Sequence, residues 1–126
     1  MQQQAIAIIG LGRVGSAFLD ALRNRPRQGI QIIAVAEPNH TPGRMAAENA
    51  GIPVYDVQDL IARSQDIDIL FDLTGSHAVR QELREGLAAS HNQRTVIAPE
   101  SVARMIWALT VEGGGLPEVH QETGYY

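Results

Sequence analysis

Hydrophobic and polar positions along the chain change their period several times, and each change predicts a boundary between elements. The segment from Gln4 to Ile9 is a short, nearly continuous apolar run, which is typical of a strand buried on both faces. From Val14 to Leu22 the apolar positions instead recur at i, i+3, i+4, i+7 and i+8, which is the spacing of one helix face. Pro26 and Gly29 should end this helix, and a second apolar strand is predicted from Ile30 to Ala36.

The alternation of strand and helix continues almost to the end of the chain. A third strand is predicted over 52–55, and Pro53 makes it an edge strand, because proline has no N–H to donate to a neighbouring strand. The same patterns predict strands over 52–55, 67–73 and 95–98, and helices over 44–50, from Asp56 onward, over 78–89 and over 100–111. Strands that alternate with helices form parallel sheets through right-handed crossovers. We therefore predict an α/β fold: a doubly wound parallel sheet of about five strands in the order 3-2-1-4-5, with helices on both faces.

The length of the chain suits a single domain followed by a short tail. Its 126 residues fall within the usual range of roughly 100–150 residues for one domain, and 44% of them are hydrophobic. The strand and helix pattern stops at about residue 111, and three glycines follow at 113–115. We therefore expect one folded domain over 1–112 and a Gly-rich linker or tail over 113–126.

The composition excludes several kinds of chemistry. All 10 cationic residues are Arg, so the chain has no Lys for a Schiff base or a Walker-type phosphate site, and it has no Cys for a thiolate metal site. The net charge of -4 argues against nucleic acid as a partner, and the spacing of the 4 His residues predicts no metal site. The apolar runs are too short for a secretory segment or a membrane span. We therefore expect a soluble, cytoplasmic protein with no membrane partner.

Three glycines directly follow the first predicted strand and open the first predicted helix. In this G-x-G-x-x-G pattern, Gly10 allows the tight turn, Gly12 leaves room for a pyrophosphate against the backbone, and Gly15 lets the helix pack close to the strand. The N-terminus of the helix offers free N–H groups and a partial positive charge to the phosphates. The pattern in this context predicts a dinucleotide site. The alternative is a tight strand-to-helix turn that holds no ligand.

An acidic residue stands where such a site needs one. Glu37 ends the second predicted strand, about 20 residues after the glycines, where a carboxylate binds the adenosine ribose hydroxyls and repels a 2′-phosphate. We therefore expect NAD(H) to be preferred over NADP(H), unless the Arg44 side chain folds back over the ribose. The alternative for Glu37 is a solvated acid at a strand end. The Ser16 hydroxyl is expected to donate either to a phosphate or to its own helix backbone.

Two stretches of the chain resemble a known group of oxidoreductases. The runs from Ala5 to Gly15 and from Ile33 to Asn39 are similar to the N-terminal NAD(P)-binding Rossmann domain of glucose–fructose oxidoreductase/inositol dehydrogenase-type enzymes, and in outline to those of homoserine dehydrogenase and dihydrodipicolinate reductase. The resemblance covers about residues 4–98 and concerns nucleotide binding rather than one reaction. The cofactor-binding residues that it implies are Gly10, Gly12, Arg13, Val14 and Gly15 at the pyrophosphate, Glu37 at the adenosine ribose, and Thr74, Gly75 and Ser76 beside the middle of the cofactor.

The chain departs from that group where the group carries its chemistry. The group's loop after the fifth strand is Glu-Lys-Pro, whose Lys helps to bind substrate and cofactor, whereas this chain has Ala98-Pro99-Glu100. The group also has a second α/β domain for the substrate, and the residues after 112 are too few to build one. We therefore expect a cofactor domain without a substrate domain, and the catalytic residues remain unknown at this stage.

Two residues near the ends of predicted elements have alternative roles. His77 follows the Thr-Gly-Ser turn, so it lies either near a nicotinamide or in water at the start of a helix. Trp107 lies beside the apolar stripe of the last helix and belongs either to the core or to a dimer surface.

Charged residues around the fourth predicted strand are given structural roles. Asp66, Asp68 and Asp72 alternate there and favour rim or capping groups over an acid–base pair. The following helix is expected to have a solvated face that carries Arg80, Arg84 and Glu85.

Three functions agree with these patterns. In the first, which we prefer, the chain is an NAD(H)-binding module that lacks a substrate domain and serves as a cofactor-sensing or regulatory domain. In the second, it is the cofactor-binding domain of an NAD-dependent oxidoreductase that another subunit or a missing C-terminal domain completes. In the third, it is a Rossmann scaffold that has lost its ligand. The expected partners are the dinucleotide, a second copy in a homodimer and, in the second case, a partner domain or subunit.

Overall fold

Four parallel strands form one sheet at the centre of the molecule. The computed structural model describes residues 3–23 and 29–110. Its strands lie in the order β2-β1-β3-β4, and all three pairings are parallel. The bounds are β1 (Gln4–Ile9), β2 (Ile30–Ala36), β3 (Ile69–Asp72) and β4 (Val96–Pro99). The predicted doubly wound α/β fold is confirmed, with the first strand in the interior of the sheet as expected.

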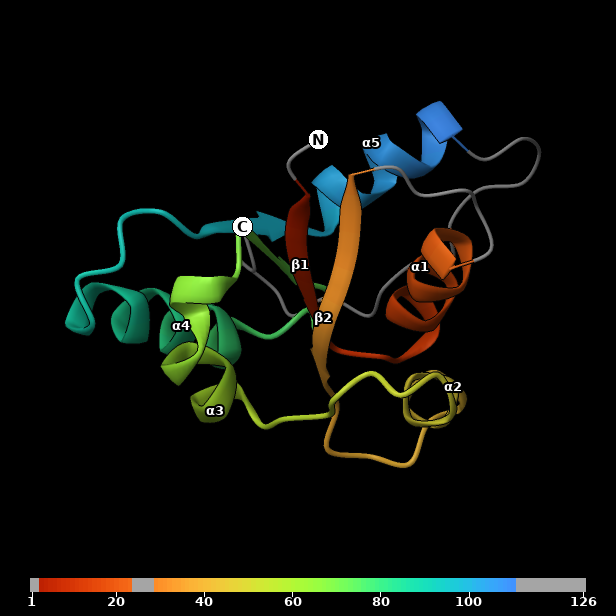
Figure 1. Ribbon diagram of the computed structural model, residues 1–126, viewed down its shortest axis with the longest axis horizontal. Coiled ribbons are helices and arrows are strands. Elements are labelled where there is room, and N and C mark those ends of the chain that lie inside the picture. Colours follow the sequence, from red (N-terminus) through yellow and green to blue (C-terminus); the bar gives the residue numbers. More distant parts are fainter. Residues whose placement is uncertain (1–2, 24–28, 111–126) are drawn as a thin grey trace.

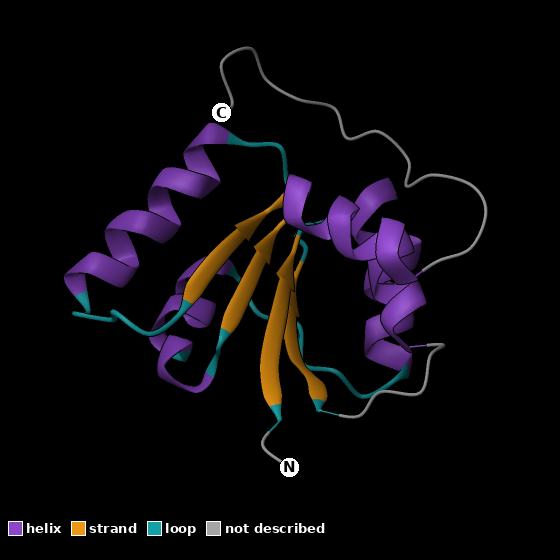
Figure 2. Cartoon of the chain, turned by 90° about the horizontal axis from the view of Figure 1, so that it is seen from above, coloured by secondary structure: helices purple, strands orange, loops and turns teal. Residues whose placement is uncertain are grey.

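Helices cover both faces of this sheet (Figures 1 and 2). The helices between strands lead from the carboxyl end of one strand toward the start of the next, which is how a parallel sheet is connected, and one further helix follows the last strand. The bounds are α1 (Arg13–Arg23), α2 (Pro42–Asn49), α3 (Val57–Ala62), a short 3-10 helix η1 (Ser64–Asp66), α4 (His77–Ala89) and α5 (Glu100–Thr110).

The alternation of side chains along the strands divides the core into two layers. Ile8 of β1 and Phe71 of β3 face one layer, where they meet residues of α1, α2 and α5. Ile9 and Leu70 face the opposite layer, where they meet α3 and α4. In the first layer the rings of Phe18 and Phe71 lie 4.9 Å apart and are tilted by 57°, which joins α1 directly to the centre of the sheet. Burial on both faces explains why the strand sequences are almost continuously apolar.

The predicted third strand over 52–55 is reduced to a single bridge, so the sheet has four strands instead of five. Val54 pairs in parallel with Val35, flanked by hydrogen bonds from Val35 N to Pro53 O (3.0 Å) and from Tyr55 N to Val35 O (2.8 Å). Two local features prevent a longer ladder. Pro53 has no N–H to donate, and Asp56 already caps α3 by accepting a hydrogen bond from the backbone N–H of its third residue. The predicted order is otherwise retained, because this segment lies beside β2.

The second helix begins two residues before its predicted start. The Thr41 hydroxyl accepts a hydrogen bond from Arg44 N (3.1 Å), and Pro42 occupies the first turn, where no backbone N–H is needed. The Thr-Pro pair was therefore a start signal that the apolar pattern alone did not provide.

Some predicted features lie outside the described residues. These are the stop at Pro26, the end of the last helix at Val111 and the linker or tail over 113–126. Among the residues that are described, no helix is both long and apolar enough to cross a membrane.

Candidate dinucleotide site

The turn from β1 into α1 leaves no space for side chains at two of its three glycines. Gly10 has a φ of +92°, and a Cβ atom there would lie 3.0 Å from the backbone of Leu73 and Thr74. A Cβ atom on Gly15 would overlap the carbonyl oxygen of Gly10. By contrast, a Cβ atom on Gly12 would meet nothing within 4 Å. The space above Gly12 is therefore open, as a site that brings a phosphate against the backbone requires.

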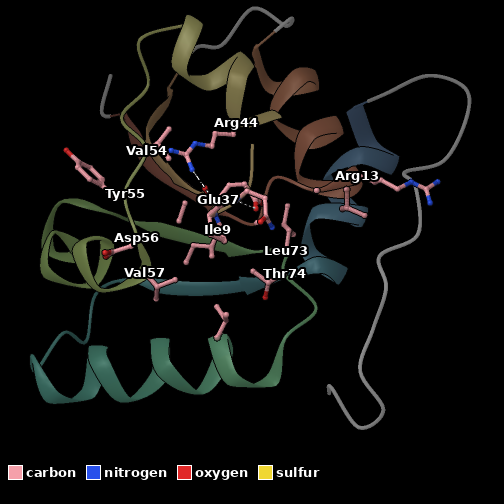
Figure 3. A pocket seen from close by; sticks show the side chains of 17 residues that line it. Ile9, Arg13, Glu37, Arg44, Val54, Tyr55, Asp56, Val57, Leu73 and Thr74 are labelled. Carbon is pink, nitrogen blue, oxygen red and sulfur yellow. Dashed lines mark hydrogen bonds between the residues drawn. The ribbon is translucent and has the colours of Figure 1, made fainter. Parts of the chain in front are cut away.

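The N-terminus of α1 begins at Arg13, directly after the open space at Gly12. The first N–H groups of a helix have no partner within the helix, and they carry a partial positive charge. The first turn of α1 contains no acidic side chain that would compete for them. Arg13 is exposed at the start of the helix, and Figure 3 shows its side chain extending away from the centre of the site.

Glu37 is a fixed, nearly buried carboxylate at the end of β2. Its Oε1 accepts a hydrogen bond from the backbone N–H of Leu11 (2.7 Å), and its Oε2 accepts one from the N–H of Asn39 (3.0 Å). The residue is only 8% exposed. The bond to Leu11 ties the glycine-rich turn to the neighbouring strand. The carboxylate retains lone pairs for further donors, because two oxygens offer about four acceptor positions.

Arg44 reaches back from α2 to the same strand end (Figure 3). Its Nη1 donates to the carbonyl oxygens of Glu37 (2.8 Å) and Pro38 (3.4 Å). Its Nε lies 3.7 Å from Glu48 Oε2, an ion-pair distance, and this buried atom has no hydrogen-bond partner within the described part of the chain. Arg44 thus ties α2 to the end of β2 through the backbone carbonyls of Glu37 and Pro38.

These groups surround one cavity of about 780 Å³, within the usual size range of small-molecule sites. Figure 3 shows the labelled side chains around it, with Glu37 near the middle. The lining residues come from the glycine-rich turn, the end of β2, Arg44, the segment 54–57, the end of β3 and α4. They are Ile9, Gly10, Gly12, Arg13, Val14, Ala36, Glu37, Pro38, Asn39, Arg44, Val54, Tyr55, Asp56, Val57, Leu73, Thr74 and Val79.

A chain of hydrogen bonds holds the loop between β3 and α4. Asp72 is fully buried, and its Oδ1 accepts from both the backbone N–H (3.1 Å) and the hydroxyl (2.7 Å) of Thr74. Its Oδ2 accepts from Arg80 Nε at 2.8 Å. Thr74 Oγ1 accepts from Ser76 N (3.1 Å), and Ser76 Oγ accepts from Val79 N (3.3 Å) at the start of α4. The loop is thus positioned by internal bonds.

The structure brings most of the predicted cofactor-binding residues to one place. Three of them, Gly15, Gly75 and Ser76, do not line the cavity, although Ser76 is joined to Thr74, which does. The lining residues among the predicted set are Gly10, Gly12, Arg13, Val14, Glu37 and Thr74. Sequence analysis missed the apolar wall formed by Val54, Val57 and Val79. The parallel bridge between Val54 and Val35 brings Val54 and Val57 to the cavity. The predicted strand order 3-2-1 already placed the segment 52–55 beside the second strand.

Several charged residues have roles that differ from their predicted ones. Arg80 is largely buried, with 13% of its side chain exposed, so the prediction of a solvated face is wrong for this residue. Its side chain points inward because it forms an ion pair with the buried Asp72. Asp72 is not a rim group either. Asp68 accepts a hydrogen bond from Ala5 N (2.7 Å) before β3 begins, whereas Asp72 ends that strand, so the two do not form a carboxylate pair. Asp66 is exposed in η1.

Three residues with alternative predicted roles are now placed. The Ser16 hydroxyl donates to Leu11 O (2.8 Å), so it supports the turn backbone. His77 is exposed and does not line the cavity. Trp107 is half-buried and packs against the core layer of α1 and α5.

The fold and the site together define a class of protein. A parallel sheet with an interior first strand, a glycine-rich turn into the first helix and an acid at the end of the second strand characterises Rossmann-type dinucleotide-binding domains. The chain belongs to the family of homoserine dehydrogenase NAD-binding domains, whose family model matches residues 10–99. The sequence resemblance to nucleotide domains of this kind is therefore confirmed. No curated protein matches the chain significantly.

Solved structures of dehydrogenases share the fold at low sequence identity. Scyllo-inositol dehydrogenase from Lactobacillus casei, solved with NAD(H) and scyllo-inositol, is 19% identical with a TM-score of 0.57 over 86% of this chain and 34% of its own. Myo-inositol 2-dehydrogenase from Lactobacillus plantarum is 18% identical with a TM-score of 0.54 over 82% of this chain and 38% of its own. An engineered D-amino acid dehydrogenase bound to NADP+ is 20% identical with a TM-score of 0.52 over 83% of this chain and 31% of its own. The chain thus spans about a third of the length of these proteins.

Removal of the Arg80 guanidinium should destabilise the fold strongly. Arg80→Ala would leave Asp72 as a buried carboxylate without its cation, and breaking a buried pair in this way costs about 3–5 kcal/mol. The measurement is the free energy of unfolding by urea denaturation. Arg84→Ala, one turn further along α4 at an exposed position, is the matched control and should change it by about 0.5 kcal/mol or less. Equal effects of the two substitutions would contradict the structural role of the pair.

Proposed function

We propose that this chain is an NAD(H)-binding module that serves as a cofactor-sensing or regulatory domain. The proposed domain comprises residues 1–112. The observation that carries the proposal is the cavity that the open space above Gly12, the N-terminus of α1 and the fixed Glu37 carboxylate share. Regulation by the cofactor then requires two arrangements of the domain or of its dimer that differ in affinity for the cofactor.

The chemistry of the cavity supports one assignment of groups to the dinucleotide. Backbone N–H groups at Gly12, Arg13 and Val14 would hold the pyrophosphate, and Gly10 and Gly15 would form the turn that presents them. Glu37 would accept hydrogen bonds from the adenosine ribose. Residues Thr74, Gly75 and Ser76 would border the middle of the cofactor. When bound, the nicotinamide supplies hydride chemistry, while the protein supplies position and electrostatics.

The preference for NAD(H) over NADP(H) is also part of the proposal. A 2′-phosphate on the ribose would lie beside the Glu37 carboxylate, which two backbone hydrogen bonds keep in place. Two like charges about 4 Å apart repel each other by several kcal/mol near a protein surface. The neighbouring Arg44 guanidinium reduces this repulsion. However, its Nη1 already donates to Glu37 O and Pro38 O, so we expect a preference rather than an exclusion.

The second candidate is the cofactor-binding domain of an NAD-dependent oxidoreductase, completed by another subunit or a C-terminal domain. The family match and the likeness to about a third of several dehydrogenases favour it. The position after β4 favours the first candidate instead. The loop there, Ala98-Pro99-Glu100, contains no Lys, and Glu100 is nearly buried and ion-paired with Arg104. Oxidation of NADH that is measured only after a partner subunit is added to the chain would support the second candidate.

Substitution of Gly12 should weaken binding without damage to the fold. Gly12→Ala adds a Cβ atom that meets no protein atom within 4 Å but occupies the space proposed for the pyrophosphate. Calorimetric titration with NAD and NADH should give micromolar dissociation constants for the natural chain, weakened by about tenfold or more in the variant, or about 1.4 kcal/mol. Urea denaturation should show an unchanged free energy of unfolding. If the natural chain binds no nucleotide, the turn is architectural and the scaffold interpretation replaces this proposal.

Neutralisation of Glu37 should shift the cofactor preference. Glu37→Gln keeps an amide oxygen for Leu11 N and removes the charge that faces a 2′-phosphate, so the ratio of NADP to NAD dissociation constants should fall by about tenfold. The matched control is Glu48→Gln, because Glu48 also neighbours Arg44 but does not line the cavity. An unchanged ratio in Glu37→Gln, measured by the same titrations, would refute the proposed role of the carboxylate.

The proposed partner is a second copy of the chain. The proposed location is the cytoplasm, because a charged dinucleotide does not cross a lipid membrane by itself. β4 is an edge strand of the described sheet, and Val96, Met105 and Leu109 are large apolar residues left exposed on β4 and α5. Sedimentation equilibrium should show a dimer whose dissociation constant changes when NADH saturates the site. A monomer at all concentrations, or a dimer indifferent to NADH, would argue against the dimer as the regulated state.

A further inference from the structure

We infer that the contact between Gly43 of α2 and Ser16 of α1 couples α2 to the nucleotide site, so that a bound nucleotide fixes the position of α2. This inference rests on the proposed function and specifies which element of the domain responds to the cofactor. Neither Gly43 nor Ser16 lines the cavity. Both would therefore act as positioning residues and not as ligand contacts.

The first turn of α2 lies directly against the first turns of α1 (Figure 1). Gly43 is buried there, and a Cβ atom on it would overlap the Ser16 hydroxyl oxygen. The same atom would lie 2.9 Å from Ser16 Cβ and 3.1 Å from Leu11 Cβ. Ala47, one turn further along α2, is fully buried in the core layer that α1 shares. A single methyl group at residue 43 would therefore fit only if α2 or Ser16 moved.

The Ser16 side of this contact leads to the glycine-rich turn. The Ser16 hydroxyl donates to Leu11 O (2.8 Å), and Leu11 N donates to Glu37 Oε1 (2.7 Å). The Leu11 side chain is fully buried, so this residue is held through its N–H, its carbonyl and its side chain. Leu11 directly precedes Gly12, where the pyrophosphate is proposed to lie. Movement of Ser16 would therefore disturb the backbone beside the phosphate position.

The α2 side of the contact leads to the wall of the cavity. Arg44 follows Gly43 in the chain, and its Nη1 donates to Glu37 O (2.8 Å). Glu37 Oε2 in turn accepts a hydrogen bond from Asn39 N (3.0 Å). Arg44, Glu37 and Asn39 all line the cavity. The loop over 37–44 is thus attached to the glycine-rich turn at both of its ends, so a shift of α2 would change the shape of the cavity wall.

Coupling between two parts of a protein is reciprocal. A nucleotide binds more tightly when the walls of its site are already held in position, because less conformational entropy is then lost on binding. If the fitted position of α2 raises the affinity for the nucleotide by some factor, the nucleotide must favour that position by the same factor. Binding of NAD or NADH is therefore expected to stabilise α2, which makes α2 the element through which the domain responds to its ligand.

A cycle of variants of the full chain tests the coupling by calorimetric titration with NAD. Gly43→Ala should weaken binding by about tenfold. Ser16→Gly removes both atoms of Ser16 that the added methyl group would meet, so in that background Gly43→Ala should weaken binding by no more than about threefold. Ser16→Gly itself costs helix stability, so this rescue of binding could not come from a more stable fold.

The matched control is Gly86→Ala, which adds the same methyl group at another contact between helices. A Cβ atom on Gly86 of α4 would lie 2.6 Å from Ile61 Cδ1 of α3, and neither residue lines the cavity. This variant should lower the free energy of unfolding in urea but leave the NAD dissociation constant within about threefold of its natural value. Equal weakening of NAD binding by Gly86→Ala and Gly43→Ala would show a general effect of loosened packing and overturn the inference.

Hydrogen exchange of the backbone N–H groups of α2 is the second measurement. In the natural chain, saturation with NAD should slow this exchange by about tenfold, the same factor as the loss of affinity in Gly43→Ala. Exchange in α2 that NAD leaves unchanged would overturn the inference. This measurement needs no variant, so it decides the question even if Gly43→Ala does not fold.

The remaining results separate the inference from the proposed function. If the natural chain binds NAD but Gly43→Ala binds it equally well, or if Ser16→Gly gives no rescue, the coupling is absent and the dinucleotide proposal stands. If the natural chain binds no nucleotide, the proposed function itself fails.

Discussion

The close approach of two backbones between β1 and α1 is the constraint on which the rest of the structure depends. Gly15 lies against the carbonyl oxygen of Gly10, so α1 can pack onto the sheet only if neither position carries a side chain. This packing brings Phe18 onto Phe71 and forms the core layer shared by α1, α2 and α5. The same turn points the helix N-terminus at the carboxyl end of the sheet. The geometry that fixes the core therefore also creates the site.

Glu37 extends this constraint from the turn to the neighbouring strand. Its bond to Leu11 N fixes the turn relative to β2, and its bond to Asn39 N fixes the carboxylate itself. A ligand that meets a site already held in position loses less conformational entropy on binding. One residue thus fixes the turn and holds a carboxylate at the wall of the cavity. This double role explains why it is almost buried although it ends a strand at the surface.

The opposite edge of the site is built from polar groups that satisfy one another. Asp72 accepts hydrogen bonds from Thr74 and Arg80, and the Thr74 hydroxyl accepts one from Ser76 N. A buried carboxylate is tolerated only with such partners, which makes the loop a rigid border.

The sequence alone determined the order of the elements, because apolar runs and the 3.6-residue spacing are local properties. It also determined the glycine-rich turn and the acid at Glu37, since that motif depends on short distances along the chain. It could not show that the segment 52–55 makes only one bridge, because that depends on Pro53 meeting Val35 across space. Nor could it show that Asp72 buries Arg80, that Arg44 turns back over Glu37, or that Val54 and Val57 complete a cavity wall. Those features join residues from different elements, so only the tertiary packing decided them.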